Sequence, residues 1–418
     1  MTDVYVVGTA STPFARHPER DFRSLADEVV RSSLHDAGLD SGTVIGQAWF
    51  GNCAMGHWGQ DNIRGQVALT GLMRDGTLPA RLPVLNVEAG CATGSAALHA
   101  AFKDVAAGTS DLSLAVGVEK TWIPDDPVKT FQLFAGGIDQ RHRSEWKTFF
   151  AEQGEIHGVG WAPDPRRILF LDVHAMQARH HMARYGTTPA QLAAVASKNH
   201  RHGSLNPKAQ YRFEIDVEGV LADRAVVEPF TRAMCAPISD GAAAVLLCSG
   251  AWLANQPAAV RDRAIRVRAS TLTGGTWRGL DEDNVVTVAA RKAYAQAGIR
   301  PEDVDIAEVH DSTAYCELQA TEALGFCAPG SGGAYAESGA TALGGERPVN
   351  LSGGLESKGH PLGATGLGMV DELVTQLRGE AGDRQAPGHP TVGVQQNAGG
   401  LIGLDEALCA VTVLERVR

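Results

Sequence analysis

Residues 350–366 of the chain read NLSGGLESKGHPLGATG, a segment with five glycines and a single histidine, His360. Small residues at this density let the backbone turn tightly and let another element approach closely. We expect a small-residue turn here, followed by a helix rich in Gly, Ala and Thr that begins near His360. The question is whether the chain contains a matching element for this turn to face.

A similar segment occurs in the first half of the chain. Residues 82–102 read LPVLNVEAGCATGSAALHAAF, again a small-residue turn before a helix, with Cys91 at the start. The likeness extends to residues 31–50 and 291–310, which align at a shift of 260 residues. Each of these reads as the end of an amphipathic helix, a glycine stop at Gly38 or Gly298, a polar turn and a strand. The pattern predicts two similar α/β halves.

Short apolar runs at residues 112–118, 242–248 and 410–414 are typical of buried strands, so helices and strands alternate in both halves. Between the halves the rhythm is broken by a segment rich in Trp, His and Arg, which we interpret as an inserted loop domain. The predicted domains are an N-terminal half (1–121 plus 236–258), the insert (122–235) and a C-terminal half (259–418).

The insert carries nine basic residues, enough positive charge to bind a nucleotide phosphate if several converge. An ordinary solvated surface explains each of them equally well. They are Arg141, Arg143, Lys147, Arg166, Arg167, Lys198, Arg201, Lys208 and Arg212.

The bulk composition narrows the function classes. The chain has 418 residues, 44% of them hydrophobic, and can bury a large core. Its net charge of -11 is spread along the sequence, which disfavours nucleic acid or an anionic membrane as the partner. Seven scattered cysteines favour reduced thiols over a disulfide framework. With no signal peptide pattern and no run of eighteen apolar residues, we expect a cytoplasmic, unanchored protein.

Cys91 is the candidate nucleophile. A cysteine in the first turn of a helix is close to free backbone N–H groups and the helix dipole, which favour the thiolate and should lower its pKa. Its small neighbours would let a thioester reach those N–H groups as an oxyanion hole. Taken alone, a cysteine in this position is more often a buried packing residue.

Two histidines could work with this thiol. His360, surrounded by glycines, could accept the proton of a facing cysteine. His310 follows the apolar strand VDIAEV, where a strand end would aim its side chain into a crevice and toward a developing enolate oxygen. A structural alternative is that Asp311 or Ser312 simply caps the helix that follows, with His310 adjacent.

Metal and nucleotide chemistry find little support in the sequence. It contains no CxxC, HExxH or close Cys/His pairing that would indicate a metal site. No GxGxxG follows the first strand and no GxxxxGK[ST] occurs. We therefore expect no metal and no tightly bound cofactor.

Together, the segments GHPLGATG, GCATGSAAL and SDGAAAVLL resemble the thiolase superfamily, and the resemblance runs from the first strand to the last. The pair His310–Asp311 stands where biosynthetic thiolases have Asn–Glu, which is similar to the sterol-carrier-protein-2 type of thiolase. The resemblance implies a duplicated five-layer αβαβα fold, a loop domain that holds coenzyme A (CoA), and a homodimer or dimer of dimers.

The same resemblance implies roles for individual residues. Cys91 would carry the acyl group, His360 would activate it, and His310 would hold a water or oxygen at the enolate oxyanion hole. Gly399 would supply a backbone N–H to a second oxyanion hole. Ala236 and Pro237 would lie along the pantetheine arm of CoA, which would act as substrate or product.

The chain departs from the family at the second reactive cysteine. The CxGG turn of most thiolases reads QNAGG here, with Asn397 in place of the cysteine. The sterol-carrier type takes its acid/base cysteine from an HDC motif, and here that position is Ser312. Cys316, one helical turn further on, could present a thiol on the same side, although core packing is the simpler interpretation.

Three functions remain open. The first is an acyl-CoA C-acyltransferase that cleaves a 3-oxoacyl-CoA with CoA or runs the reverse Claisen condensation, with Trp122, Trp146 and Trp161 as candidate walls of a pocket for an aromatic or branched acyl group. The second is a thiolase-like acyltransferase or aldolase that works with a small OB-fold, zinc-ribbon subunit. The third is a non-catalytic binder of acyl-CoA or lipid. Because Cys91, His310 and His360 are all present, the first is favoured.

Overall fold

Glycine ends the corresponding helix in each half of the chain. In the computed structural model, which describes residues 2–124 and 126–417, helix α1 (Phe22–Asp36) is followed by Gly38 at φ +71° and then by strand β2 (Gln47–Gly51). Helix α11 (Val285–Ala297) is followed by Gly298 at φ +65° and strand β9 (Ile306–Glu308). A left-handed φ costs glycine little and lets a helix stop abruptly. The predicted repeat is confirmed in the secondary structure.

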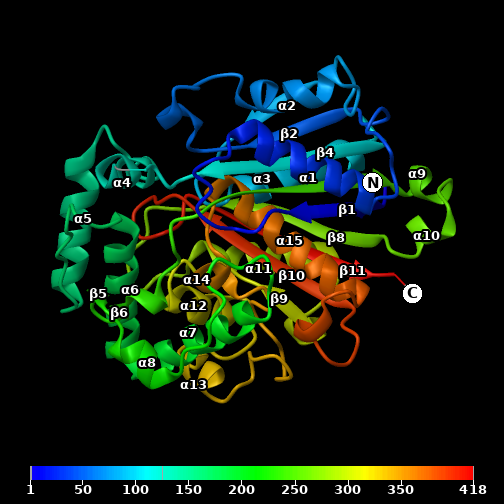
Figure 1. Cartoon of the computed structure of the whole chain (residues 1–418). Coiled ribbons are helices and arrows are strands. Elements are labelled where there is room, and N and C mark those ends of the chain that lie inside the picture. The colour runs from blue at the N-terminus through cyan, green and yellow to red at the C-terminus, as the bar shows by residue number, and fades with distance from the viewer. Residues whose placement is uncertain (1, 125, 418) are drawn as a thin grey trace.

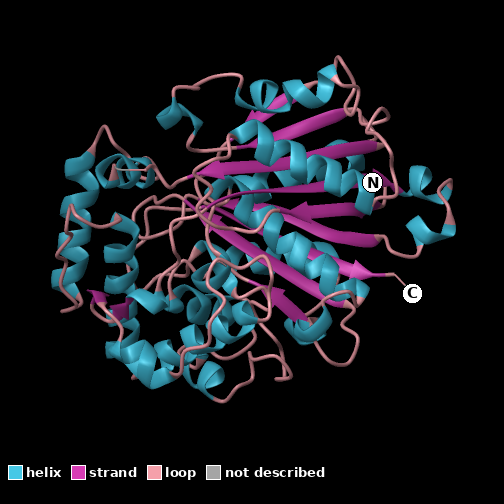
Figure 2. Ribbon diagram, in the orientation of Figure 1, coloured by secondary structure: helices cyan, strands magenta, loops and turns pink. Residues whose placement is uncertain are grey.

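Nine of the strands in the described residues form one mixed sheet (Figure 2), in the order β3-β2-β4-β7-β1-β8-β11-β10-β9. The predicted strands at 112–118, 242–248 and 410–414 are confirmed as β4, β7 and β11. Strands β1 and β8 are paired only at Tyr5 with Arg266 and at Val6 with Ile265, so two half-sheets meet at a narrow seam. The remaining strands of this sheet are β1 (Val4–Ser11), β3 (Val84–Val87), β4 (Leu112–Lys120), β7 (Asp240–Ser249), β8 (Ile265–Gly274), β10 (Val392–Gly399) and β11 (Leu408–Arg416).

Two helices are buried between the half-sheets (Figure 1). Helix α3 (Thr93–Ala106) packs on β2, β4 and β7 of the first half and on β8 and β11 of the second. Helix α15 (Leu362–Arg378) packs on β4 and β7 and, across the molecule, on β9 and β10. The outer faces are covered by α1 and α2 (Arg64–Arg74) on one side and by α11 with α12 (Ala314–Ala323) on the other. This is the expected sequence of helix, sheet, helix, sheet, helix.

Strand β7 shows why the layers form. Alternate side chains of a strand point to opposite faces. Ala242, Ala244 and Leu246 join the core beneath α1 and α2, whereas Ala243, Val245 and Leu247 join the core around α3 and α15. A strand whose residues 242–248 are all apolar therefore satisfies two cores at once.

The two buried helices begin in backbone contact because the residues between them are glycines. A Cβ atom on Gly117 of β4 would lie 2.0 Å from the carbonyl oxygen of Gly363, and one on Gly94 of α3 would lie 2.8 Å from the same atom. Neither distance leaves room for a side chain. The starts of α3 and α15, which Cys91 and His360 immediately precede, are thereby brought together.

A largely helical segment connects β4 to β7 and lies at one end of the sheet (Figure 1). It contains α4 (Pro127–Ala135), α5 (Arg143–Ile156), α6 (Leu169–Tyr185), α7 (Pro189–Ser204), α8 (Val217–Ala222) and the small hairpin β5 (Ala225–Val227) and β6 (Phe230–Thr231). The domain boundaries proposed from the sequence, at 121/122 and 235/236, fall in the connections that flank this segment and stay a prediction.

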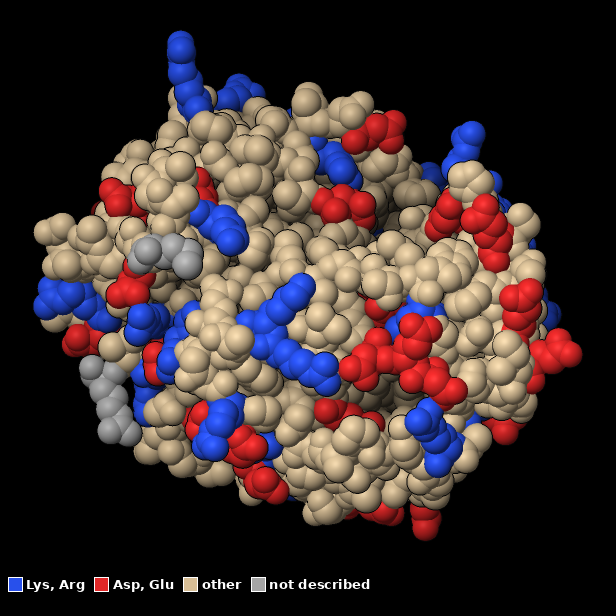
Figure 3. All heavy atoms as spheres, turned by 180° about the vertical axis from the view of Figure 1, so that it is seen from behind, with Lys and Arg blue, Asp and Glu red and all other residues tan. Residues whose placement is uncertain are grey.

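The other elements are short. They are α9 (Gly250–Ala254), α10 (Ala258–Arg261), α13 (Gly332–Glu337), α14 (Gly354–Lys358) and the 3-10 turns Met55–Trp58, Arg232–Met234, Pro301–Asp303 and Gly382–Arg384. Across residues 2–124 and 126–417, no helix has the length and apolar character needed to cross a membrane. On the face shown in Figure 3, basic and acidic side chains are interspersed among neutral ones.

Candidate active site

Three segments of the chain converge on one small site. Cys91 precedes α3, His360 precedes α15, and His310 follows β9. One side-chain nitrogen or sulfur atom from each of the three lies within 4.8 Å of those of the other two. These residues line a single cavity together with Gly399, Ala236 and Pro237. The structure therefore brings together all six residues that the sequence singled out.

The Cys91 thiol is partly buried and makes no hydrogen bond to another side chain among the described residues. Burial raises its pKa to about 12, even though its own backbone N–H acts in the opposite direction, and the carboxylates Glu119 and Glu88 raise it further. The expectation that the helix start would lower this pKa is wrong, because desolvation outweighs the N–H contribution. The thiol consequently depends on a neighbouring base.

His360 presents a hydrogen-bond acceptor in the same cavity. Its Nδ1 lies 2.8 Å from Thr365 Oγ1. The Thr365 hydroxyl donates its own hydrogen to the Pro361 carbonyl at 3.0 Å, so it accepts a hydrogen from His360 Nδ1. The hydrogen-bond network thus assigns the proton to Nδ1 and the lone pair to Nε2. Nε2 is buried with no hydrogen-bond partner among the described residues, and burial lowers the pKa of His360 to about 3, so the ring is neutral.

His310 has the opposite assignment. The register of β9 and β10 pairs Glu308 with Gln395, so Asn397, two residues further, lies beside His310. Asn397 Nδ2 is 2.9 Å from His310 Nδ1, and the Asn397 Oδ1 accepts from Ser95 Oγ at 3.0 Å, which fixes the orientation of the amide. The amide therefore donates to Nδ1 and leaves the hydrogen on Nε2.

The two imidazoles are therefore complementary. Their ring centroids are 5.0 Å apart in an edge-to-face arrangement. Burial and the nearby imidazoles of His360 and His174 hold the pKa of His310 well below its usual range, so it too is neutral. One ring offers an acceptor and the other a donor. Asn397, which replaces a family cysteine, sets the tautomer of His310.

The positions around the missing second thiol form a polar corner of the cavity. Ser312 Oγ lies 3.5 Å from His174 Nδ1, and Cys316 Sγ lies 3.5 Å from the same atom. Ser312 and His174 line the cavity, whereas Cys316 lies behind them. Burial raises the pKa of Cys316 to about 11. Cys316 thus shares the helix face of Ser312 as its spacing indicated, but one layer further from Cys91.

Asp311 does not cap the helix that follows it. The N-cap of α12 is Thr313, without a side-chain cap hydrogen bond. Asp311 instead accepts from the backbone N–H of Leu355 at 2.7 Å and from Asn199 Nδ2 at 3.0 Å. The capping alternative is wrong, because Asp311 ties the loop carrying His310 to the start of α14, shortly before His360.

The walls of the cavity are apolar and differ from the tryptophans that we expected. Phe134, Ile168, Phe170 and Leu171 line it, from α4, α6 and the residue before α6. Trp146 and Trp161 belong to a separate core around Phe150, and Trp122 lies under Arg16. The interpretation of the tryptophans as pocket walls is wrong. Their sequence neighbourhood gave no information on which side chains of this segment face the active site.

Two cavity residues have no signal in the sequence. His174 lies in the helical run LFLDVHAMQARHHMARY, where nothing distinguishes it from neighbouring histidines. Glu406 follows β10 in the loop GLIGLDEA. Both line the Cys91 cavity. The only sequence cue was that Glu406 comes seven residues after Gly399, itself predicted to be at the site.

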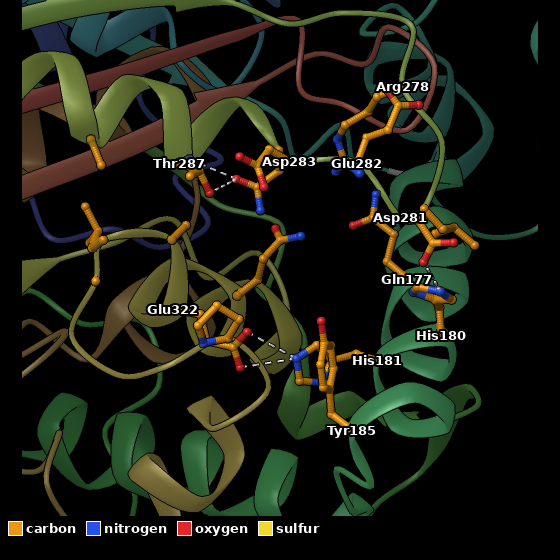
Figure 4. A pocket seen from close by; sticks show the side chains of 18 of the residues that line it. Gln177, His180, His181, Tyr185, Arg278, Asp281, Glu282, Asp283, Thr287 and Glu322 are labelled. Carbon is orange, nitrogen blue, oxygen red and sulfur yellow. Dashed lines mark hydrogen bonds and ion pairs between the residues drawn. The ribbon is translucent and has the colours of Figure 1, made fainter.

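A larger cavity of about 460 Å³ lies elsewhere, between α6, α11 and α12 (Figure 4). Several of its titratable groups are paired with one another. His181 contacts Glu322 at 3.2 Å and His180 contacts Asp281 at 3.2 Å. It contains no cysteine or other strong nucleophile among its lining residues, so the chemistry points to the smaller cavity.

Within residues 2–124 and 126–417, two groups of side chains have donor atoms close enough for a metal ion. They are Cys91 with His310 and His360, and His157 with His180 and Asp281. In the second group Arg184 already forms an ion pair with Asp281, which opposes cation binding. In the first group the assigned tautomers leave one imidazole nitrogen as a donor, which suits an oxyanion better than a metal.

A thiol beside one imidazole acceptor and one imidazole donor defines an enzyme that transfers groups through a covalent thioester. The sequence matches the family described as thiolase, N-terminal domain, over residues 4–251, and the family described as thiolase C-terminal domain-like over residues 279–412. The chain belongs to the thiolase family, and it is an acyltransferase.

The relatives include proteins from archaea, animals and bacteria. The chain is 37% identical to acetyl-CoA acetyltransferase of Methanothermobacter thermautotrophicus over 408 residues, which cover 96% of this chain and 98% of that one. It is 33% identical to sterol carrier protein 2 of Bos taurus, covering 95% of this chain and 70% of the relative. It is 31% identical to the benzoylsuccinyl-CoA thiolase subunit BbsB of Thauera aromatica, covering 95% and 94%.

Solved structures share the fold. An Ltp2-ChsH2(DUF35) aldolase superposes with a TM-score of 0.77 at 19% identity, over 100% of this chain and 99% of that one. The Acat5 thiolase from Ascaris suum in complex with coenzyme A superposes with a TM-score of 0.66 at 18% identity, over 99% and 100%. The predicted thiolase fold is confirmed.

Proposed function

We propose that the enzyme carries an acyl group on Cys91 and cleaves a 3-oxoacyl-CoA with CoA, or runs the reverse Claisen condensation. The observation that carries the proposal is the pair of opposite tautomers, with an acceptor on His360 and a donor on His310. A non-catalytic binder of acyl-CoA would need neither assignment.

The first chemical step requires a base. Cys91 is protonated at neutral pH because burial raises its pKa to about 12, so its proton passes to His360 Nε2 as sulfur attacks the ketone carbon. The bond between the α and β carbons then breaks, and the shorter thioester leaves as an enolate. His310 Nε2–H donates to the enolate oxygen, where a preorganised hydrogen bond is worth most.

A second oxyanion position fits the backbone around Cys91. A Cβ atom on Gly399 would lie 2.4 Å from the backbone nitrogens of both Cys91 and Ala92, so only glycine permits this approach. We assign the N–H groups of Cys91 and Gly399 to the oxygen of the acyl-enzyme. Removing one such donor typically costs about 10²–10³ in rate.

The cavity walls suggest the substrate. Phe134, Ile168 and Phe170 present apolar surface beside Cys91, which favours a branched or aryl acyl group. Ala236 and Pro237 offer a narrow apolar edge for the pantetheine arm. For the CoA phosphates we propose Arg141, Arg143 and Lys147, at the start of α5. Arg166, Arg167, Lys198 and Lys208 are instead occupied by carboxylates.

Intact-protein mass after exposure to acetyl-CoA and to branched and aryl acyl-CoAs tests the nucleophile. We expect one acyl adduct on the wild type and none on Cys91→Ala. Cys53→Ala is the matched control, because its sulfur lies 3.3 Å from the Gly90 carbonyl next to Cys91, and it should acylate normally. An adduct that persists in Cys91→Ala, or a wild type that forms none with any thioester, contradicts the proposal.

A partner subunit is a second possibility. One structural relative is an aldolase complex named with a DUF35 component, and one sequence relative is named as a thiolase subunit. We propose a homodimer that can bind a small OB-fold, zinc-ribbon subunit. The retained Cys91 favours acyl transfer over an aldol reaction. Light scattering of the chain, alone and co-expressed with such a protein from the same genome, distinguishes the two states.

The cellular location is also a proposal. All seven cysteines are free in the structure, which suits a reducing compartment. We place the enzyme in the cytoplasm.

A further inference from the structure

The proposed reaction has one proton transfer that Cys91, His360 and His310 leave unassigned. After the carbon–carbon bond breaks, the α carbon of the departing enolate needs a proton. Later, CoA must lose its thiol proton to attack the acyl-enzyme. Asn397 and Ser312 stand where relatives of the family have cysteines, and an amide or an unactivated hydroxyl cannot perform these transfers near neutral pH.

The cavity contains one carboxyl group, Glu406. It belongs to the loop between β10 and β11, the same loop that begins at Gly399 beside Cys91. One of its oxygens, Oε2, is fully buried and has no hydrogen-bond partner among the described residues. A buried carboxyl oxygen without a partner is unusual and costs stability unless it serves another purpose.

The loop holds Glu406 firmly in place. Leu401 donates from its N–H to the Gly137 carbonyl at 2.8 Å, and Gln177 Nε2 donates to the Leu404 carbonyl at 2.8 Å. Asp405, next to Glu406, forms a buried ion pair with Arg278 at 3.0 Å and accepts from the Val285 N–H at 2.9 Å. These contacts come from α6, from α11 and from the end of α4. A side chain on so constrained a loop has a defined direction.

We infer that Glu406 is the proton donor and acceptor that replaces the missing second cysteine. The inference deepens the proposed thiolase reaction and rests on it. In the cleavage direction the Glu406 carboxyl gives its proton to the α carbon of the enolate and becomes a carboxylate. That carboxylate then takes the proton from the CoA thiol as its sulfur attacks the thioester on Cys91. Cys91 leaves as a thiolate and recovers its proton from His360, so both groups return to their starting states.

The state of the group suits this task. Burial raises the pKa of Glu406 from its ordinary value, while Arg278 and His174 act in the opposite direction. A carboxyl with a raised pKa can hold a proton closer to neutral pH and still release it. This supports the assignment, which stands on the position of the side chain in the cavity.

The other polar groups are less suited. Burial lowers the pKa of His174 to about 4, so its imidazole carries no acidic proton at neutral pH, and its Nδ1 faces Ser312 and Cys316. Glu119 is also buried, with a pKa raised to about 7. Its two oxygens, however, accept from the N–H groups of Cys53, Ala54 and Gly363. It fixes the backbone and has no oxygen free for substrate.

The test separates acylation from proton transfer at carbon. p-Nitrophenyl acetate acylates a reactive thiol without needing an acid, because p-nitrophenolate leaves unprotonated. Exchange of the α-hydrogens of acetyl-CoA with deuterium in D2O needs a base at carbon. We expect Glu406→Gln to keep the p-nitrophenolate burst within about threefold and to lose about 10²–10⁴ in exchange rate. Glu406→Asp, which keeps a carboxyl, should have an exchange rate between those of Glu406→Gln and the wild type. It is the control for a loss of exchange that comes from misfolding of the amide variant.

Two further variants identify the outcome. Glu302→Gln, an exposed carboxyl distant in the sequence, is the matched control and should match wild type. Normal exchange in Glu406→Gln overturns the inference, as does loss of exchange in His174→Gln with Glu406→Gln unaffected. A wild type that forms no acyl-Cys91 overturns the proposed function as well. A wild type that acylates while Glu406→Gln exchanges normally overturns only the role of Glu406.

Discussion

The turns before α3 and α15 are copies of one structural unit, yet they differ in how firmly their reactive side chains are held. In each turn the reactive residue follows a glycine with positive φ: Gly90 at +54° precedes Cys91, and Gly359 at +111° precedes His360. His360 is buried, and its ring and backbone are bonded to Thr365 and Ser239. Cys91 is half-buried and its sulfur has no side-chain partner among the described residues. The duplicated unit has been specialised into a fixed base and an unrestrained nucleophile.

The difference follows from what each group must do. A base must present one nitrogen in one tautomer, so hydrogen bonds that lock the ring are useful. A nucleophile must change its bonding and accept a bulky acyl group, so contacts to its sulfur would have to be broken at each turnover. If this division of labour is right, damage to the fixed turn should alter pH dependence, and damage to the contact between the turns should alter stability.

The largest effect should come from removing the base. His360→Gln leaves Cys91 to ionise unaided, and we expect its acylation at pH 7 to fall by about 10²–10⁴. Because the pKa of Cys91 is raised to about 12, the thiolate fraction of the variant grows about tenfold per pH unit across the accessible range. The wild type, whose His360 has a pKa lowered to about 3, should show little change above pH 6.

The p-nitrophenolate burst rate between pH 6 and 9.5 measures this slope. His142→Gln, which replaces an exposed histidine, is the control. Its burst rate should depend on pH in the same way as that of the wild type. A pH-independent burst in His360→Gln would show that the thiol is activated by another group.

Reversing the tautomer of His310 should have a smaller effect on the rate, with a pH dependence in the opposite direction. In Asn397→Asp a carboxylate replaces the amide donor and should raise the pKa of His310. At a pH below that raised pKa, His310 is an imidazolium with a hydrogen on both ring nitrogens, so Nε2 still donates to the enolate oxygen. At a pH above it, the ring keeps one hydrogen, on Nδ1 where it faces the introduced carboxylate, and Nε2 no longer donates to the enolate oxygen. Activity should therefore fall by about 10²–10³ as pH rises.

Thiolysis rates between pH 5.5 and 9 check this prediction, with exposed Asn255→Asp as the control for added charge. An unchanged pH profile in Asn397→Asp would mean that the amide has no influence on the ring of His310.

The smallest effect concerns the close contact between strand β4 and the start of α15. Gly117→Ala would place a Cβ atom 2.0 Å from the Gly363 carbonyl oxygen, and forcing β4 and α15 apart should cost about 1–3 kcal/mol in the free energy of unfolding. Gly71→Ala, at an exposed position of helix α2, has nothing within 4 Å of the new Cβ atom. It should instead increase the free energy of unfolding by about 1 kcal/mol.

Urea unfolding of the two variants makes the comparison. Equal stabilities would show that the close approach of β4 and α15 tolerates a methyl group and does not control the site.

The sequence was informative wherever local rules decide the structure. Gly38 and Gly298 end their helices because glycine adopts the left-handed φ at little cost, and the apolar run 242–248 within β7 is typical of a strand buried on both faces. The convergence of Cys91 and His360 was also accessible, because two copies of a unit must pack on one another to bury their apolar faces. These inferences need no knowledge of distant contacts.

The failures concern properties set by residues far away in the chain. The pKa of Cys91 depends on how much protein covers it and on Glu119 and Glu88, and not on its helix alone. Asp311 bonds to Leu355 across the site instead of to its own helix. Glu406 lines the cavity on a loop in which Asp405 is held by Arg278, over a hundred residues earlier. No periodicity or motif encodes such a pairing.

The narrow seam between β1 and β8 has a consequence for the life of the newly made chain. With only two residue pairs bridging the half-sheets, each half can form most of its own sheet before the two dock. The thiol and its imidazole base come from opposite sides of that junction, so neither half is reactive alone. A ribosome-bound or misassembled chain would therefore expose a cysteine that lacks its neighbouring imidazole, and the thiol would gain that partner only once assembly is complete.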